Sequence, residues 1–162
     1  MVIEKRKHVL GDDHPDTLLS MENLVNTYRN QGHWNNAKEL EVVVMEKMKQ
    51  LLGEDHPDML MTMGNLVNTY QNQDHWKDAK ELEVVVMEKR KHVLEDDHPD
   101  MLLSIGNLAA TYWNQGHWNA AEELEVVMME NRRQLLGEDH HNTLLSVSNL
   151  AIYHQRSGCQ FL

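Results

Sequence analysis

Eleven histidines are the residues of this chain that first suggest a metal site. Two series recur at 42-residue steps: His14, His56 and His98, and His33, His75 and His117. Copies one step apart would lie in different layers of a stacked structure, too far apart to share a zinc ion with bonds of about 2.1 Å. His140 and His141 are the one adjacent pair. We therefore assign the histidines structural or surface roles and expect neither a metal nor another cofactor.

Asparagines form a second periodic set, at Asn23, Asn65, Asn107 and Asn149. A carboxamide offers a donor and an acceptor, so a column of them can pair with the backbone of an extended peptide of any sequence. Packed helices lie about 8–10 Å apart and an extended chain advances about 3.3 Å per residue. One Asn per layer would then hold roughly every third peptide residue. The alternative is that these side chains bond neighbouring helices and fix the stack.

Patterns typical of catalysis are missing from the sequence. It contains no Gly-rich phosphate loop, no nucleophile elbow and no Cys/His pair in a suitable context. The single cysteine, Cys159, excludes an intrachain disulfide framework and favours a reducing compartment. We therefore predict a cytoplasmic protein that is not an enzyme.

The charge balance excludes two classes of partner. The 162 residues include 26 Asp and Glu against 15 Lys and Arg, a formal net charge of −11. Nucleic-acid phosphates and anionic lipid head groups repel such a surface. The longest apolar run has four residues, against the ~20 that a membrane-spanning helix needs. We expect neither a nucleic-acid nor a membrane partner.

A 42-residue repeat organises the elements that carry these residues. Asp-His-Pro-Asp begins at Asp13, Asp55 and Asp97, and Trp34, Trp76 and Trp118 keep the same spacing. Such a period predicts a solenoid, in which each unit buries its apolar face against its neighbours. We divide the single domain, residues 1–162, into a partial second helix (1–10), three repeats (11–52, 53–94 and 95–136) and a partial fourth repeat (137–162).

Each repeat is expected to form two helices. The first spans roughly residues 16–31, with Asp13 as its N-cap and Gly32 at its end. Plotted at 100° per residue, its residues separate into two faces. The apolar face holds Leu18, Met21, Leu24, Val25 and Tyr28, and the opposite face holds Leu19, Asn23, Asn26 and Asn30.

The second helix spans roughly residues 34–52 and begins at Trp34, which with its copies we predict to be core at the turn. Glu39, Glu41 and Glu46 are expected to form an acidic outer edge. The predicted buried residues are Ala37, Leu40, Val43, Val44, Met48, Leu51 and Leu52.

These residues resemble the tetratricopeptide repeat, through Leu24, Tyr28, Gly32, Trp34 and Ala37. The 42-residue period with Leu-Gly-Glu-Asp-His-Pro-Asp between units is most similar to the kinesin-light-chain type, also found in fungal and bacterial multi-repeat proteins. The resemblance implies an all-α, right-handed superhelical solenoid of antiparallel helix pairs. Glu41 departs from it, because the family usually has a large apolar residue there, and we expect altered packing angles.

The resemblance also implies that the first helices line a concave groove that binds an extended peptide or a partner protein. Trp113, at a position that varies between repeats, is our candidate apolar anchor, with packing against an adjacent helix as the alternative. The predicted groove residues are Leu19, Asn23, Asn26, Met61, Asn65, Asn68, Leu103, Asn107, Trp113 and Asn149.

A second function class remains open. Residues 2–10 match residues 86–94, so the sequence starts inside a second helix and stops after a first helix. Solenoids normally need polar caps, so either the sequence is a piece of a longer array or another copy covers its ends. Residues 2–10 of one chain against residues 142–155 of another would give a head-to-tail homo-oligomer. The alternative function is therefore self-assembly through the terminal helices.

Overall fold

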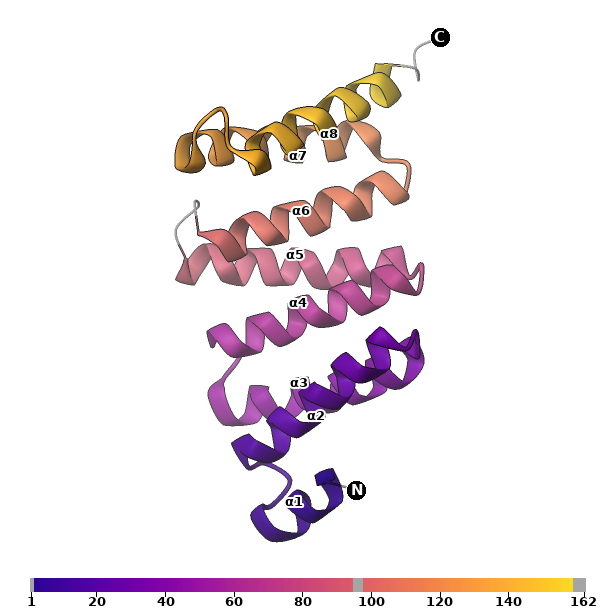
Figure 1. Cartoon of the computed structure of the whole chain (residues 1–162), viewed down its shortest axis with the longest axis vertical. Coiled ribbons are helices and arrows are strands. Elements are labelled where there is room, and N and C mark those ends of the chain that lie inside the picture. Colours follow the sequence, from indigo (N-terminus) through magenta and orange to yellow (C-terminus); the bar gives the residue numbers. More distant parts are fainter. Residues whose placement is uncertain (1, 95–97, 159–162) are drawn as a thin grey trace. The chain divides into compact units, whose positions relative to one another are not determined.

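Helices make up nearly all of the described chain, as the computed structural model of residues 2–94 and 98–158 shows (Figure 1). Within these two ranges there are eight helices and no strand. Asp97 and Cys159, used in the predictions above, lie outside the described residues. The chain divides into two compact units, residues 1–75 and 76–162, and each is described by itself.

The first unit alternates the two helix types predicted from the repeat. We call α2 and α4 first helices, because each follows an Asp-His-Pro-Asp turn, and α1 and α3 second helices. α1 packs on α2, α2 on α3 and α3 on α4. The bounds are α1 Val2–Leu10, α2 Pro15–Asn30, α3 Trp34–Leu52 and α4 Pro57–Asn72.

The second unit repeats the same alternation. Here α5 and α7 are second helices, and α6 and α8 are first helices. α5 packs on α6, α6 on α7 and α7 on α8. The bounds are α5 Trp76–Val93, α6 Pro99–Asn114, α7 Trp118–Leu136 and α8 His141–Gly158.

A histidine caps the start of each first helix, whereas the sequence predicted Asp13 for this role. Nδ1 of His14 accepts the Asp16 N–H at 3.1 Å, and proline follows at the first helical position. Nδ1 of His56, His98 and His140 accepts the equivalent N–H at 3.2, 3.1 and 3.2 Å. The first histidine series is therefore structural, as predicted.

A left-handed residue follows the C-cap of α2, α4 and α6. Gly32 and Gly116 have φ of 73° and 78°, and the N–H of the next residue, His33, reaches back to Tyr28 O at 2.8 Å. Asp74 holds the equivalent position after α4, with φ of 58°. A side chain is disfavoured at such φ values, so this turn is strained relative to its two copies.

Each unit has a small apolar core. In the first, Ile3 joins Leu18, Met21 and Val44, with Leu24, Leu40 and Met48 packed against them. In the second, Met101, Ile105 and Met128 are buried, with Met87, Leu102 and Leu124 around them.

Some residues predicted to be buried are not. Val43, Leu51 and Leu52 are exposed. Val43 is rotated about 100° from Val44, whereas Leu51 and Leu52 lie in the last turn of α3. Trp34 and its copies are only partly buried, since each is the first residue of its helix. Among the described residues, no helix has the length and apolar character needed to cross a bilayer.

Candidate binding surface and its buried carboxylates

The first helices carry exposed aliphatic side chains at one repeated position, which we call the aliphatic row. Leu19 on α2 is 53% exposed and Met61 on α4 is 50% exposed. In the second unit, Leu103 on α6 is 53% exposed and Leu145 on α8 is 46% exposed. One exposed leucine is ordinary, but recurrence in every first helix marks a candidate contact surface.

Carboxamides accompany the aliphatic row in the first unit. Asn23 and Asn26 on α2 are exposed, whereas Asn65 and Asn68 on α4 are partly buried. Asn72, one turn further, donates from Nδ2 to the Asn68 backbone oxygen at 2.7 Å. Asn23 and Asn26 are thus the carboxamides that a peptide could reach most directly.

In the second unit the asparagines at the Asn23 position serve the fold. Asn107 on α6 and Asn149 on α8 are partly buried. Each faces a buried carboxylate of the preceding second helix, Glu83 or Glu125, and favours its charged form. The alternative that these side chains link neighbouring helices therefore describes Asn107 and Asn149.

Glutamates at one position of each complete second helix are buried. Glu41, Glu83 and Glu125 are 2%, 0% and 1% exposed. The prediction that Glu41 lies on an acidic outer edge is therefore wrong, although Glu39 and Glu46 are exposed as expected. Position 41 precedes Val44 by three residues, so helical geometry places its side chain on the core face.

Glu83 has the most perturbed ionisation. Burial raises its pKa from 4.5 to about 7. The side chains of Ser104, Arg90 and Asn107 oppose this rise, because they favour the charged carboxylate. Burial also raises the pKa of Glu125, opposed by Ser146, Asn149 and Arg132.

Arginine bridges link second helices to the first helices that follow. Nη1 of Arg90 donates to Ser104 Oγ at 2.6 Å and to Asp100 O at 2.8 Å. Equivalent bridges join Arg6 to Ser20 at 2.5 Å and Arg132 to Ser146 at 2.7 Å. Arg90 and Arg132 are seven residues after the buried glutamates, two helical turns along the same face, and they partly balance those charges.

The first repeat lacks this bridge. Met48 replaces the arginine and Thr62 replaces the serine. The Thr62 hydroxyl instead donates to Asp58 O of its own helix at 2.9 Å. Glu41 is compensated in part by the Thr69 side chain and by Arg29, whose Nη1 lies 4.0 Å from Glu41 Oε1. The bridge and the buried glutamates were not predicted, although the paired change from Arg and Ser to Met and Thr was visible in the aligned repeats.

Trp113 packs within the second unit. Its ring stacks on Tyr153 of α8 with centroids 4.5 Å apart and an interplanar angle of 21°, and it lies 6.5 Å from the ring of Trp118. It is partly buried. The structure thus shows the alternative interpretation, packing against adjacent helices, which leaves only part of the indole for a ligand.

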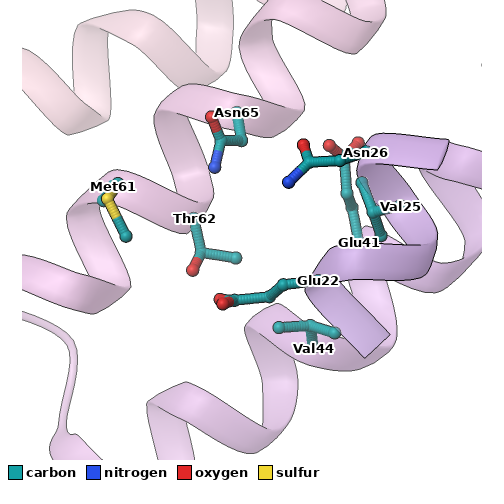
Figure 2. A pocket seen from close by; sticks show the side chains of 8 residues that line it. All are labelled: Glu22, Val25, Asn26, Glu41, Val44, Met61, Thr62 and Asn65. Atoms are coloured by element: carbon teal, nitrogen blue, oxygen red, sulfur yellow. The ribbon is translucent and has the colours of Figure 1, made fainter. Parts of the chain in front are cut away.

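A hollow of about 260 Å³ lies between α2, α3 and α4 in the first unit (Figure 2). Figure 2 shows Glu22, Thr62 and Asn65 directed into this space. Its walls combine apolar and polar groups from all three helices. The lining residues are Glu22, Val25, Asn26, Glu41, Val44, Met61, Thr62 and Asn65.

The second histidine series lies beside tyrosines. His33, His75 and His117 have ring centroids 6.3, 6.3 and 5.9 Å from those of the preceding tyrosines, Tyr28, Tyr70 and Tyr112. Within residues 2–94 and 98–158, no three His, Cys, Asp or Glu side chains gather as metal ligands would.

The fold is shared with crystal structures of repeat proteins. Two structures contain nearly identical tetratricopeptide-like repeats of a kinesin light chain-like protein from Podosopora anserina. One is 27% identical, covering 97% of this chain and 74% of that one with a TM-score of 0.84. The other is 29% identical, covering 90% and 69% with a TM-score of 0.80.

A third structure, BtubC from P. vanneervenii, is 16% identical and shows the fold alone. Its TM-score is 0.76, over 94% of this chain and 61% of that one. Among curated protein sequences, none matches this chain. The all-α arrangement of antiparallel helix pairs predicted from the sequence is confirmed.

A family model supplies the assignment. The tetratricopeptide repeat model matches three consecutive segments, residues 17–58, 59–100 and 101–142. The segments keep the 42-residue period and cover most of the chain. This chain therefore belongs to the tetratricopeptide repeat family.

Proposed function

We propose that the chain is a non-catalytic interaction module whose first helices bind an extended segment of a partner protein. Tetratricopeptide repeats imply a protein-interaction or scaffold role. The observation that carries the finer proposal is the aliphatic row, half exposed at the same position of every first helix. Beside it, Asn23 and Asn26 offer donors and acceptors to a peptide backbone.

A selection from a random peptide display library tests this proposal. The wild type is compared with Leu19→Ser/Met61→Ser/Leu103→Ser, which removes apolar area from the aliphatic row without touching either core. The matched control is Val43→Ser/Val85→Ser/Val127→Ser, on the second helices, where the side chains are 40%, 40% and 45% exposed. We expect a shared motif to be enriched on the wild type and the control but not on the row variant. Equal enrichment on all three would overturn the proposal.

A second candidate, self-assembly, is favoured by the apolar surface of α8. Leu144, Val147 and Ile152 are 52%, 49% and 52% exposed. The α6 counterpart of Val147, Ile105, is buried against Met101 and Met128. We propose that the second-type helix α1 of another copy covers this face of α8.

A further inference from the structure

A buried carboxylate, Glu41, is among the groups that line the hollow in the first unit. Glu41 is 2% exposed, and neither of its carboxylate oxygens accepts a hydrogen bond of ordinary geometry. Thr69 and Arg29 face it and lower its pKa in part, but burial has the larger effect and raises it. A buried charge without adequate partners is unfavourable, so a cation placed there would be stabilised.

The other repeats show which group is missing. Arg90 and Arg132 bring a guanidinium to the serine of the next first helix and partly offset the charges of Glu83 and Glu125. Burial still raises both pKa values, and both Glu83 oxygens and Glu125 Oε1 accept no hydrogen bond of ordinary geometry. The first repeat has Met48 in that place. A positive group supplied from outside would give Glu41 the partial charge compensation that arginine gives Glu83 and Glu125.

The charges around the hollow favour such a ligand. Glu22 lines it and is partly buried; burial and repulsion from Asp58 both raise its pKa. Arg29 contributes one positive charge, 4.0 Å from Glu41. One guanidinium against the three carboxylates of Glu22, Glu41 and Asp58 leaves the surroundings negative.

We infer that this hollow binds a basic side chain, arginine or lysine, of the partner segment. Its volume of about 260 Å³ is below the usual range for drug-sized ligands and suits a single side chain. Val25, Val44 and Met61 would pack against the aliphatic stem, while Glu22, Glu41 and the carboxamides receive the charged head. This inference rests on the function proposed above and names the chemistry of one residue of its ligand.

The repeats differ at a residue that lines this hollow. A ligand residue bound in the hollow would therefore fix where the ligand lies along the row of repeats. At the place of Glu22 the other repeats have Gly64, Gly106 and Ser148, which carry no charge. A basic residue would therefore be read by the first repeat alone.

The test uses a probe small enough not to need the rest of the surface. Amide chemical shifts of the ¹⁵N-labelled full chain are followed while N-acetylarginine methylamide is added at constant ionic strength, with the neutral citrulline analogue as comparison. We expect saturable shifts at Glu22, Asn26 and Asn65 with the arginine probe only. Equal shifts with both probes, or no shifts, would overturn the inference.

Variants then assign the shifts to the hollow. Glu22→Gln should weaken binding of the arginine probe by about fivefold or more. Glu39→Gln, which removes an equal charge from an exposed site, should leave the affinity unchanged. Met48→Arg/Thr62→Ser restores the internal bridge, so it should abolish probe binding while the helical circular dichroism stays unchanged. Unchanged affinity in both Glu22→Gln and the restored-bridge variant would contradict the inference.

The outcome is separable from that of the display experiment. If a peptide motif is enriched without a basic residue and the arginine probe does not bind, the hollow proposal fails and the peptide-binding proposal stands. If the probe binds but no peptide is enriched, the proposal that the hollow binds a basic side chain is supported, and the proposal that the aliphatic row binds a peptide is not.

Discussion

Three glutamates at one repeat position bring carboxyl groups into cores that a tetratricopeptide repeat usually fills with an apolar side chain. Their carboxylates are removed from water, while serine, threonine, asparagine and arginine side chains partly compensate for the lost hydration. A raised pKa in the folded state means that the folded chain holds its proton at a pH where the unfolded chain has lost it. The free energy of unfolding then falls as the pH rises from the pKa of the unfolded chain to that of the folded chain.

Glu83 gives the clearest prediction of this kind. Its pKa is about 7 folded against 4.5 as the ordinary value, so the carboxyl costs no stability below about pH 4.5 and costs most above pH 7. Glu83→Gln cannot ionise, and its stability relative to the wild type should rise by about 3 kcal/mol between pH 4.5 and pH 8. Urea unfolding at a series of pH values measures this. An exposed control, Glu81→Gln, should show no such trend, and a flat difference for Glu83→Gln would refute the assignment.

Asp74 carries the second prediction at this scale. Because it has φ of 58° where the other two turns have glycine, Asp74→Gly should relieve the strain. We expect stability to increase by about 0.5–1 kcal/mol, seen as a higher urea midpoint with an unchanged slope. The reciprocal change, Gly116→Asp, should decrease stability by a similar amount. A loss of stability in Asp74→Gly would show that the aspartate side chain stabilises the turn.

At the scale of helices, the sequence predicts bounds better than it predicts partners. α3 spans the predicted residues 34–52, and α2 begins and ends one residue before the predicted positions, because proline and glycine punctuate the chain strongly. The prediction for Glu41 was wrong because it was based on residue type. The spacing from Val44 indicated a core position, whereas a carboxylate is usually exposed to solvent. The N-cap of α2 is His14 and not Asp13, because Nδ1 of the His14 imidazole accepts the Asp16 N–H.

The candidate surface was predicted with the same limits. Helical periodicity was enough to place Leu19, Met61 and Leu103 on an exposed face. Helical periodicity could not predict that Asn107 faces Glu83 or that Trp113 stacks on Tyr153, because both contacts depend on which helices pack together.

The arginine bridge yields a prediction that couples two helices. Arg90→Met leaves the buried Glu83 without its cation and should destabilise the chain by on the order of 2–4 kcal/mol at pH 7. Adding Ser104→Thr reproduces the Met48 and Thr62 combination of the first repeat and should recover part of that loss. A double-mutant cycle from urea unfolding should give a coupling energy of at least about 0.5 kcal/mol. Strict additivity would show that the paired replacement is coincidental.

At the scale of the whole molecule, the proposed end-to-end association has its own test. Val147→Lys places a charge in the exposed apolar face of α8 and should shift any oligomer toward monomer, because the partner helix would bury that charge. Sedimentation velocity over a hundredfold range of concentration measures the change. Val85→Lys, at an exposed site on α5, is the control. A wild type that stays monomeric throughout would remove self-assembly as a function.

The bridge between Arg90 and Ser104 also bears on how such a chain can be rearranged by recombination. The two partners belong to different repeats, since the boundary at residues 94 and 95 runs between them. Unequal crossing-over at that boundary could join a second helix that carries methionine at the bridge position to a first helix that carries serine. It could also join a second helix that carries arginine to a first helix that carries threonine. Crossovers inside a helix pair, between its first and second helices, would keep the partners together. The exchangeable cassette of this gene is therefore a second helix with the first helix that follows it, offset from the repeat that the sequence displays.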